Sequence, residues 1–384
     1  MTAATRDPRR PLPSPSKTRA AVAPFPGAPP ALAIRVGLRA RSLLRRLTDR
    51  LSPPELVVFD RATAIAEGAL FGAIARADVA DLLEERGPLD AAAVAEARGL
   101  DADATHRALR ALAASGVFTL RADGRFENNR LSRALRSGTD ERTREMAIYF
   151  TSPSNAEAWL ACAHTLETGE SSFEHVHGKT VWEWFDAHPD EREIFAHAMM
   201  GITRVDAPVV ARLYPFEDVA RVCDVGGGRG TLLSEILKRH AHLRGVLCDA
   251  AGVCESARQL LAERGVAHRV ELAPGSFFER VPSGADLYVL KNILHDWDDD
   301  TCRVILRVVR RAMQPGQRLL VCESLVEKNS RDPLGTRADL QMMMVCRGRE
   351  RSRAELHELF EATGFAPART FPFPTVSLVE AVAR

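Results

Sequence analysis

The sequence predicts an α/β protein in which a helical N-terminal region precedes a parallel sheet with helices on both faces. Two observations support this fold class. Before about residue 213 the apolar residues recur at helical spacing, and after it short apolar runs alternate with helical segments. With 384 residues, 46% of them hydrophobic, the chain is long enough for about two to three domains. We expect an extension over 1–50, a winged-helix domain over 51–140, linking helices over 141–213 and an α/β domain over 214–384.

The first fifty residues form a basic extension. They hold eleven Lys and Arg against two Asp, whereas residues 51–384 hold 41 basic and 49 acidic side chains. Residues 1–30 are rich in Pro, Ala, Ser and Arg and cannot bury enough apolar surface to fold, so the extension is assigned as disordered. Within the extension, ordered structure is expected only over 31–51, where leucines alternate with arginines. This segment would form an amphipathic helix that packs on the body or on a partner subunit. A helix on an anionic membrane and an Arg-rich targeting peptide are the alternatives.

The composition excludes several classes of protein. A net charge of +1 creates no field that would attract nucleic acid. No stretch approaches the ~18 uninterrupted apolar residues of a spanning helix, so no integral membrane protein is expected. The seven cysteines are scattered, odd in number and without a Cys-x-x-Cys pair. This usage is typical of the reducing cytoplasm and favours neither disulfides nor a zinc site.

A winged-helix pattern lies within the first helical region, between about residues 56 and 138. Helices are predicted at Asp90–Arg98 and at Asp103–Ala114, the second with Asp101 or Asp103 as its cap. Val117–Arg121 and Arg125–Asn128 then flank an Asp-Gly turn, which predicts a small hairpin. Two helices followed by a hairpin make a winged helix.

The α/β pattern follows a second helical stretch that ends near residue 213. Apolar runs that predict buried strands lie at Val219–Val225, Gly245–Cys248, Val270–Leu272, Asp286–Leu290, Arg318–Cys322 and Val376–Ala383. Helical segments alternate with them at 231–240, 252–264, 299–313 and 352–363. Gly364 ends the last segment in the manner of a C-cap glycine. The alternation predicts a parallel sheet.

A glycine-rich loop joins the first strand to the next helix and begins with an acid. Asp224 precedes Gly226, Gly228 and Gly230, a spacing that lets the backbone turn tightly and approach a ligand over the helix N-terminus. A dinucleotide-binding loop would have Gly-x-Gly-x-x-Gly, and this pattern fails at its last position. Asp249 closes the second strand, where a carboxylate can accept hydrogen bonds from both hydroxyls of a ribose. An acid beside the ligand repels pyrophosphate and suits a cationic amine, so S-adenosylmethionine fits better than NAD.

Several spaced motifs resemble one enzyme family over residues 56 to 384. They are Asp-Val-Gly-Gly-Gly-x-Gly from Asp224, Gly275-Ser-Phe-Phe, Leu290-Lys-Asn-Ile-Leu-His-Asp-Trp, Cys322-Glu, Asp339-Leu-Gln-Met and Gly348-Arg-Glu-Arg-Ser. In this order they resemble the S-adenosylmethionine-dependent small-molecule O-methyltransferases of the caffeate and hydroxyneurosporene type. The resemblance implies a Rossmann-like class I methyltransferase sheet, an N-terminal winged helix that makes a homodimer, and catalysis without a metal. It also implies a hydroxylated aromatic or polyketide-like substrate of secondary metabolism.

The resemblance assigns catalytic roles to three residues. His295 follows the fourth strand at its carboxyl end, where ligands sit in open parallel sheets, and a neutral imidazole has the pKa to accept a hydroxyl proton near pH 7. Glu323 and Glu350 match the family acids that flank this histidine, and one of them would orient the ring. The alternative is that both acids make surface salt bridges to arginines such as Arg349 and Arg351.

The resemblance also implies cofactor and substrate contacts. Besides the loop and Asp249, the cofactor residues are Ser276, Phe277 and Lys291. Ser276 stands where the family often has Asp, so it would bind the adenine amino group without charge assistance, and Phe277 would lie against the ring. The substrate pocket is expected between the helices of 141–213 and the methionine run at 342–344, with Met199, Phe195, Met343 and Phe150 as its lining.

Other interpretations are less favoured. Asp296, Asp298, Asp299 and Asp300 have the chemistry of a Mg²⁺ site, but acids in a first helical turn are favoured by the helix dipole alone, so no metal is expected. A family relative that keeps the cofactor but acts as a hydroxylase or pericyclase, or that methylates nitrogen or carbon, is an alternative function. A DNA-binding regulator is the least favoured, because the second helix of the winged-helix pattern offers few basic contacts and the body is acidic. The sequence does not identify the methyl acceptor.

Overall fold

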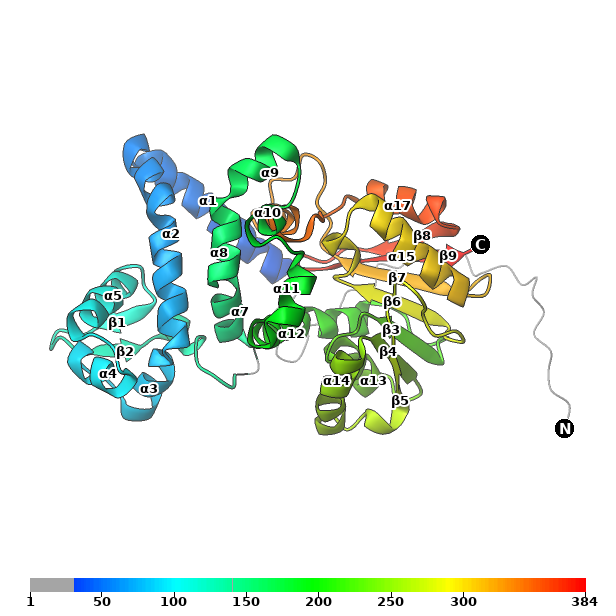
Figure 1. The fold of residues 1–384 in the computed structure, drawn as a ribbon, viewed down its shortest axis with the longest axis horizontal. Helices are drawn as coiled ribbons and strands as arrows, with labels where there is room; N and C mark the ends of the chain where they lie inside the picture. Colours follow the sequence, from blue (N-terminus) through cyan, green and yellow to red (C-terminus); the bar gives the residue numbers. More distant parts are fainter. Residues whose placement is uncertain (1–30, 140) are drawn as a thin grey trace, which may run out of the picture.

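A computed structural model describes residues 31–139 and 141–384. The helices that precede residue 213 lie on one side of the molecule, and the sheet with its own helices lies on the other (Figure 1). The disorder expected for residues 1–30 lies outside the described residues. None of the helices between Ala31 and the C-terminus that the structure describes is both long and apolar enough to cross a membrane.

The first part of the chain contains the predicted winged helix. Its elements are α1 (Ala31–Leu51), α2 (Pro54–Arg76), α3 (Val79–Arg86), α4 (Ala91–Arg98), α5 (Ala102–Ala114), β1 (Phe118–Leu120), β2 (Phe126–Asn128) and α6 (Arg130–Arg133). Asp90 caps α4 by accepting a hydrogen bond from Ala93 N, and Asp101 rather than Asp103 caps α5 in the same way. The β1–β2 hairpin is antiparallel. Leu109, Leu112 and Phe126 are fully buried in the core of this part.

The assignment of disorder to the whole extension is wrong for residues 31–50, because α1 covers them. The helix follows from the leucine and arginine spacing, which puts apolar side chains on one stripe. Ile34 packs against the core of the α/β part. Leu32, Leu43, Leu47 and other large apolar side chains of α1 are nevertheless exposed to between 49% and 78%.

A second group of helices connects the winged helix to the sheet. These are α7 (Thr143–Phe150), α8 (Pro153–Leu160), α9 (Cys162–Thr168), α10 (Ser172–His177), α11 (Val181–Ala187) and the long α12 (Pro189–Leu213). The α12 helix packs against α7 on one side and against α13 (Thr231–Arg239) of the sheet domain on the other. It is therefore the element that joins the helical region to the sheet, as Figure 1 shows.

The sheet has seven strands, and its order is β5-β4-β3-β6-β7-β9-β8. Its elements are β3 (Arg221–Val225), β4 (Arg244–Asp249), β5 (Val270–Pro274), β6 (Leu287–Lys291), β7 (Arg318–Glu323), β8 (Phe365–Phe371) and β9 (Ser377–Ala383). The first five are parallel to one another. Helices α13, α14 (Ala251–Glu263), α15 (Asp299–Ala312), α16 (Gly335–Gln341) and α17 (Arg353–Ala362) complete the domain. The α/β class with helices on both faces is confirmed.

The prediction of an all-parallel sheet is wrong at one edge. The last predicted strand, β9, runs antiparallel to β7, and β8, which was not predicted, pairs antiparallel with β9. Five residues join β8 to β9, and a connection of that length can link only antiparallel strands. Pro367 and a register shift between Pro367 and Thr370 hid β8 in the sequence, because both interrupt the alternating pattern.

The two faces of the sheet carry separate cores. One contains α12, α13 and α14 residues such as Val210, Leu233 and Leu261, and the other contains α15 and α17 residues such as Ile305 and Phe360. All five of these side chains are at most 1% exposed. The sheet is therefore covered on both sides, and the carboxyl ends of its parallel strands remain as the place for a ligand.

The crossing of α2 and α7 depends on the absence of a side chain at Gly72. A Cβ built at Gly72 would overlap the Thr151 hydroxyl, whereas one built at Gly68 in the same helix meets nothing within 4 Å. We expect Gly72→Ala to lower the free energy of unfolding by about 1–3 kcal/mol, because the helices must separate. Gly68→Ala should stabilise the protein by up to about 1 kcal/mol through helix propensity. Chemical denaturation of both variants measures this, and equal effects would contradict the close approach.

Candidate active site

The glycine loop leaves the carboxyl end of β3 in a left-handed backbone conformation that favours glycine. Gly226, Gly228 and Gly230 all have positive φ, between 56° and 80°. A Cβ at Gly226 would overlap Ile293 and come within 3.4 Å of Phe277, whereas a Cβ at Gly228 meets nothing within 4 Å. Gly226 is thus required for packing, and Gly228 leaves open space above the loop. No side chain caps the N-terminus of α13, which follows the loop.

Two carboxylates stand beside this loop. Asp249, at the end of β4, accepts hydrogen bonds from Gly228 N at 2.9 Å and from Ala250 N at 2.7 Å. Asp224 lies on the neighbouring strand with its Oδ2 buried and without a hydrogen-bond partner among the described residues. Burial, and then the charge of Asp249, raise the pKa of Asp224 to about 7. A buried carboxylate oxygen without a partner, beside a second acid, is a site for a cation.

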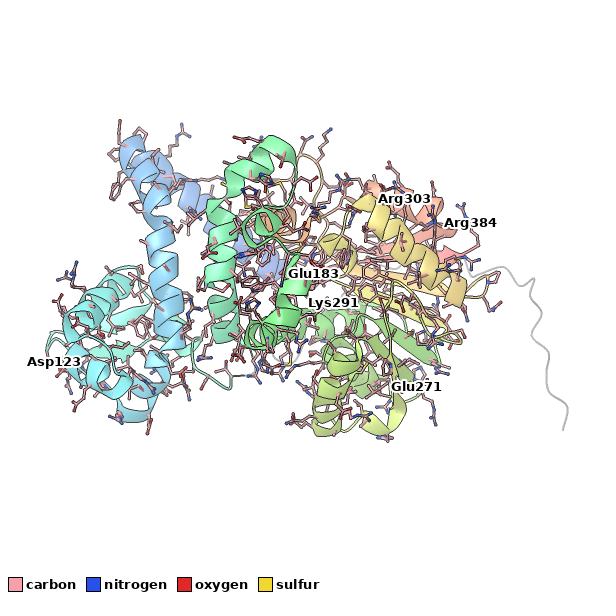
Figure 2. All side chains as sticks on the ribbon, in the orientation of Figure 1. Asp123, Glu183, Glu271, Lys291, Arg303 and Arg384 are labelled. Atoms are coloured by element: carbon pink, nitrogen blue, oxygen red, sulfur yellow. The ribbon has the colours of Figure 1, made fainter. Side chains whose placement is uncertain are left out.

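The remaining predicted cofactor residues have different surroundings. Ser276 Oγ accepts a hydrogen bond from Phe278 N at 3.2 Å, and Phe277 packs near the loop at Gly226. Lys291 is buried at the end of β6, with its Nζ 3.3 Å from Asp206 Oδ2 and 3.4 Å from Thr203 Oγ1 on α12. Figure 2 labels Lys291 where the sheet meets the helical region. Its ammonium thus ties β6 to α12.

Asp206 was not predicted as a site residue, although the sequence contains a signal for it. An acid on a helix that is otherwise apolar on that side requires a buried partner, and the chain has few lysines that could supply one. A second link to α12 was also missed. Arg229, inside the glycine loop, forms an ion pair with Glu193 and lies 3.1 Å from His197 Nε2, and both partners are on α12. The Arg229 guanidinium therefore links the glycine loop to α12.

The predicted catalytic residues lie together at the carboxyl ends of β6 and β7. His295 sits in a 3-10 turn, Leu294–Asp296, that follows β6. Its Nδ1 lies 2.9 Å from Glu350 Oε1. Glu323, the last residue of β7, contacts the backbone instead, because its Oε1 accepts hydrogen bonds from Leu294 N at 2.7 Å and His295 N at 3.1 Å. Glu350 therefore orients the ring, and Glu323 holds the turn that carries it.

The alternative of two surface salt bridges is wrong. Glu323 is 1% exposed and Glu350 is 6% exposed. Arg351 is fully buried but binds other groups: Leu294 O at 2.8 Å, Trp297 O at 2.7 Å and Asp299. Arg351 thus fixes the chain on both sides of His295.

A third acid, Asp296, was not assigned to the catalytic group. Its Oδ1 lies 3.5 Å from His295 Nε2, the ring nitrogen that Glu350 leaves free. The Cys346 thiol lies close to the same carboxyl group, and burial raises the pKa of Asp296 to about 7 against the opposing charge of His295. Its position in the sequence, directly after the histidine, was visible, but the turn that brings it to Nε2 was not.

These acids change the acid–base character of His295. Burial alone would lower its pKa, but Asp296, Glu350 and Glu323 outweigh burial and raise the pKa to about 10. The expectation of an ordinary imidazole near pH 7 is therefore wrong for this site. Because the folded pKa lies above the ordinary value of about 6.5, protonation of His295 stabilises the fold below pH 6.5, and this contribution is lost as the pH rises through about 10.

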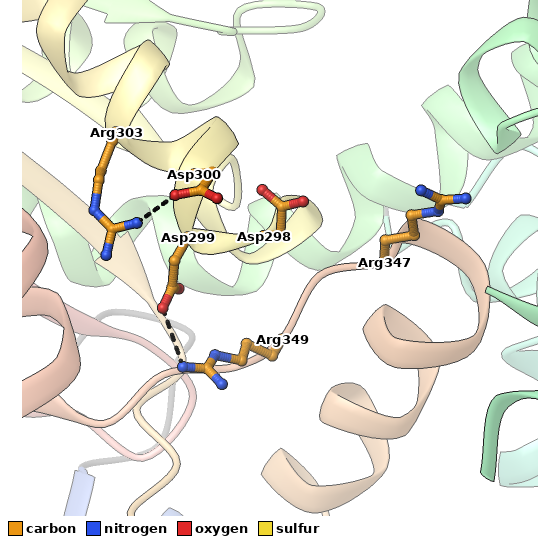
Figure 3. Close-up of a pocket in the computed structure, with 6 residues that line it drawn as sticks. All are labelled: Asp298, Asp299, Asp300, Arg303, Arg347 and Arg349. Atoms are coloured by element: carbon orange, nitrogen blue, oxygen red, sulfur yellow. Dashed lines mark hydrogen bonds and ion pairs between the residues drawn. The ribbon is translucent and has the colours of Figure 1, made fainter. Parts of the chain in front are cut away.

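The acids that follow Asp296 have partners of their own. Asp298 caps α15 through Thr301 N, Asp300 pairs with Arg303 at 2.6 Å, and Asp299 pairs with Arg349 and Arg351. Figure 3 shows them around a surface cavity of about 410 Å³ that Arg347 also lines. Between Ala31 and the C-terminus, the described residues contain no cluster of three or more His, Cys, Asp or Glu suited to a metal ion.

Three of the four predicted substrate residues share one apolar cluster. Phe195, Met199 and Met343 pack with the rings of α7 to α12, and Phe195 lies 4.7 Å from Phe185 between ring centroids. Met343 belongs to a π-helix, Met342–Cys346, that ends at Arg347 in a left-handed conformation. Phe150 is 41% exposed and lies at the edge of this cluster, where its ring packs edge-on against Tyr149 with centroids 5.0 Å apart. The cluster also contains residues that were not assigned to the pocket: Tyr149, Trp159 and Trp182.

Two family models match the sequence. An O-methyltransferase domain matches residues 159–366, and an O-methyltransferase dimerisation domain matches residues 63–138. The first spans more than half of the chain. Together they include the glycine loop, the His295 group and the winged helix.

Individual proteins are similar over most of the chain. The mitomycin biosynthesis 6-O-methyltransferase of Streptomyces lavendulae is 40% identical over 296 residues, which are 77% of this chain and 84% of that protein. The phenazine O-methyltransferase of Lysobacter antibioticus is 36% identical over 80% of this chain and 90% of that protein.

Solved structures share the fold. A mitomycin 7-O-methyltransferase superposes with a TM-score of 0.83 at 35% identity, covering 88% of this chain and 100% of that one. An O-methyltransferase from neocarzinostatin biosynthesis, in complex with S-adenosylmethionine and 2-hydroxy-5-methyl naphthoic acid, superposes with a TM-score of 0.74 at 32% identity, covering 83% and 96%.

The contact between Glu350 and Nδ1 predicts the titration of His295. We expect Glu350→Gln to lower the pKa of His295 by about 1–2 pH units, because the variant loses a charge at hydrogen-bond distance. Asp300→Asn removes an exposed acid of the same region and should leave that pKa unchanged. Nitrogen-15 NMR of the imidazole measures both, and an unchanged pKa in Glu350→Gln would show that the acid does not act on the ring.

Proposed function

The chain belongs to the family of S-adenosylmethionine-dependent O-methyltransferases, and we propose that it methylates a hydroxyl of an aromatic or polyketide-like small molecule with His295 as the general base. The observation that carries this proposal is the arrangement of acids around the two ring nitrogens of His295. Glu350 holds Nδ1, and Nε2 is left for the acceptor beside Asp296. Glu323 and Glu350 are proposed as positioning residues of the base.

The residues around the glycine loop fit S-adenosylmethionine, which supplies a methyl group on a positively charged sulfur. Solved relatives hold this cofactor or its product S-adenosylhomocysteine. We assign the cationic end to the buried Asp224, whose Oδ2 has no partner among the described residues, the ribose to Asp249 and the adenine to Ser276 and Phe277. Gly228 leaves the space that the ligand needs. Lys291 acts on this site indirectly, through Asp206 and α12.

His295 removes the proton of the acceptor hydroxyl in the proposed mechanism. The proton passes to Nε2, the O–H electron pair stays on the oxygen, and Glu350 stabilises the imidazolium through Nδ1. A base with a pKa of about 10 matches a phenol, whose own pKa is about 10. The same pKa leaves most of the imidazole protonated at neutral pH, so activity should rise toward alkaline pH.

Oxygen is the acceptor that this site favours. Two similar proteins are N-methyltransferases, one of 8-amino-8-demethylriboflavin and one of phenazine-1-carboxylate. A neutral amine attacks with its free electron pair and needs no base before transfer, whereas a hydroxyl does. The retained His295 and its acids therefore support the O-methyl assignment over the N-methyl, hydroxylase and pericyclase alternatives.

We also propose a homodimer without metal or nucleic acid. The first half of α2 exposes four large apolar side chains, Leu56, Val58, Phe59 and Ile65, at 50% to 66%, alongside the charged Glu55, Asp60 and Arg61. Large apolar side chains exposed together on one helix are typical of an interaction surface, and the adjoining residues match a dimerisation domain. The acids after His295 all have protein partners, so chelation with EDTA should leave the activity unchanged.

The general-base role predicts the behaviour of His295→Ala. With labelled S-adenosylmethionine and a panel of phenols, we expect turnover to fall by about 10²–10⁴, while cofactor affinity barely changes. The variant should partly recover at high pH, because a phenol ionises there without help. Wild-type turnover of an ordinary phenol by this variant at neutral pH would remove His295 from the mechanism.

The cofactor assignment predicts ligand selectivity. S-adenosylhomocysteine should bind at micromolar concentration, and NAD should not. Asp249→Ala should weaken binding by about 1.5–3 kcal/mol, because it removes a charged acceptor and frees Gly228. Glu255→Ala, an exposed acid on α14, is the matched control. Calorimetry that detects NAD and not S-adenosylhomocysteine would overturn the assignment.

The dimer proposal predicts the mass of a shortened chain. A protein that begins at Ser52 keeps the exposed half of α2 and the whole dimerisation match. We expect light scattering at micromolar concentration to give the mass of two chains, since α1 is not needed for that contact. A monomer would contradict the proposed role of α2.

A further inference from the structure

A second cavity, of about 220 Å³, opens on the surface beside the His295 group. It lies between α11 and the residues that follow the 3-10 turn, and the end of the π-helix closes it. The lining residues are Glu174, Thr180, Val181, Trp182, Trp297, Asp298, Thr301, Val345, Cys346 and Arg347. We call it the outer cavity. Nothing in the proposed mechanism uses it.

Two residues that line the outer cavity are neighbours of the catalytic group. Trp297 directly follows Asp296 in the chain, and the Cys346 thiol lies close to the Asp296 carboxyl group. Asp296 in turn lies 3.5 Å from His295 Nε2. The outer cavity therefore adjoins the acid that stands beside Nε2, and an acceptor that reaches Nε2 and continues past Asp296 would enter it.

Flat aromatic surfaces form the sides of the outer cavity. The indole rings of Trp182 and Trp297 are stacked, with centroids 5.7 Å apart and an angle of 25° between the planes. Phe278 holds Trp297 edge-on at 4.9 Å. The facing sides of the two indoles are occupied by each other, so a ligand in the outer cavity would meet their remaining edges and surfaces. Indole rings pack edge-to-face with planar rings and attract cations.

The charge of the outer cavity is negative. Arg347 is the only lysine or arginine among its described lining residues, and two acids of the α10 region neutralise it, Glu174 at 2.6 Å and Glu170 at 3.0 Å. Asp298 adds a further acid at the rim. On the inner side stand Asp296, Glu350 and Glu323 around one imidazole. An anionic group would meet like charges at both ends of this path.

We propose that the outer cavity is the distal subsite of the methyl acceptor, and that it takes a planar aromatic portion that is neutral or carries an amine and discriminates against a carboxylate. This inference rests on the proposed function, since it extends the same acceptor site. The names of similar proteins include carboxylates, such as 3-amino-4-hydroxybenzoate, and other compounds, such as mitomycin, so they leave the charge of the acceptor open. The charged residues around the outer cavity of this chain therefore decide which charge the acceptor can carry.

The experiment compares three acceptors that share one ring system. They are 2,3-dihydroxynaphthalene, its 6-aminomethyl derivative and its 6-carboxylate, each measured with the full chain for methyl transfer and, in the presence of S-adenosylhomocysteine, for quenching of tryptophan fluorescence. We expect the carboxylate to bind and react at least tenfold more weakly than the neutral compound, and the amine at least as well as the neutral compound. Equal or tighter binding of the carboxylate, or no binding of any of the three, overturns the inference.

The two proposals fail in different ways in this experiment. Binding in the expected charge order without methyl transfer would contradict the proposed function and leave the charge assignment intact. Methyl transfer that favours the carboxylate would support the proposed function and contradict the charge assignment.

Two variants connect the effect to the outer cavity. Glu174→Gln leaves Arg347 with one acid fewer, so discrimination against the carboxylate should fall about threefold or more, while the neutral compound is unaffected. Glu167→Gln, an exposed acid on the neighbouring α9, should change nothing. Trp182→Leu should weaken the binding of all three compounds by a similar factor. Thermal unfolding checks that this variant is folded. If Glu174→Gln and Glu167→Gln behave alike, the outer cavity does not discriminate between acceptors by their charge.

Discussion

The structure depends on burying one imidazole among three carboxylates at the carboxyl edge of a parallel sheet. Such a cluster is stable only if every group around it is held, and the chain uses distant segments to do so. Glu323 at the end of β7 binds the backbone of the turn that carries His295. The buried Arg351 binds the carbonyls of Leu294 and Trp297. Asp339, from α16, accepts the amide hydrogen of Glu350 at 2.9 Å. The end of β7, helix α16 and the residues that precede α17 are thus all bonded to the turn that carries His295 or to its partner Glu350.

Helix α12 brings the parts of the site into one body. Glu193 and His197 contact the glycine loop through Arg229, Phe195 and Met199 pack in the aromatic cluster, and Asp206 meets Lys291 beneath the sheet edge. A displacement of this helix would therefore move the cofactor loop and the acceptor wall together. The neutral His197 also fits this role, because burial and then Arg229 lower its pKa and leave Nε2 as an acceptor for the guanidinium.

The sequence predicted those features that depend on local patterns and on motif order. The hairpin of the winged helix, the strands β3 to β7 and the glycine loop follow from turn residues, apolar runs and spacing. The edge strands did not follow, because their direction is set by a short connection and by an interrupted alternation around Pro367. The basic imidazole, the place of Asp296 at Nε2 and the Asp206–Lys291 pair were also beyond the sequence, since each arises where separate segments meet in a buried volume. Phe150 illustrates the reverse case: its helical spacing suited the pocket, but its ring is half in solvent.

The exposed apolar half of α2 has a consequence for how the protein exists at all. A monomer leaves this helix facing water, so its helical state is supported only from one side, and a second copy over it would contribute to folding as well as to assembly. The stability of the chain then contains a term in its own concentration, and the midpoint of thermal unfolding rises as the protein is concentrated. At low abundance the folded population would shrink before any active-site residue is touched. The amount of enzyme activity in a cell would therefore increase more steeply than the number of chains made.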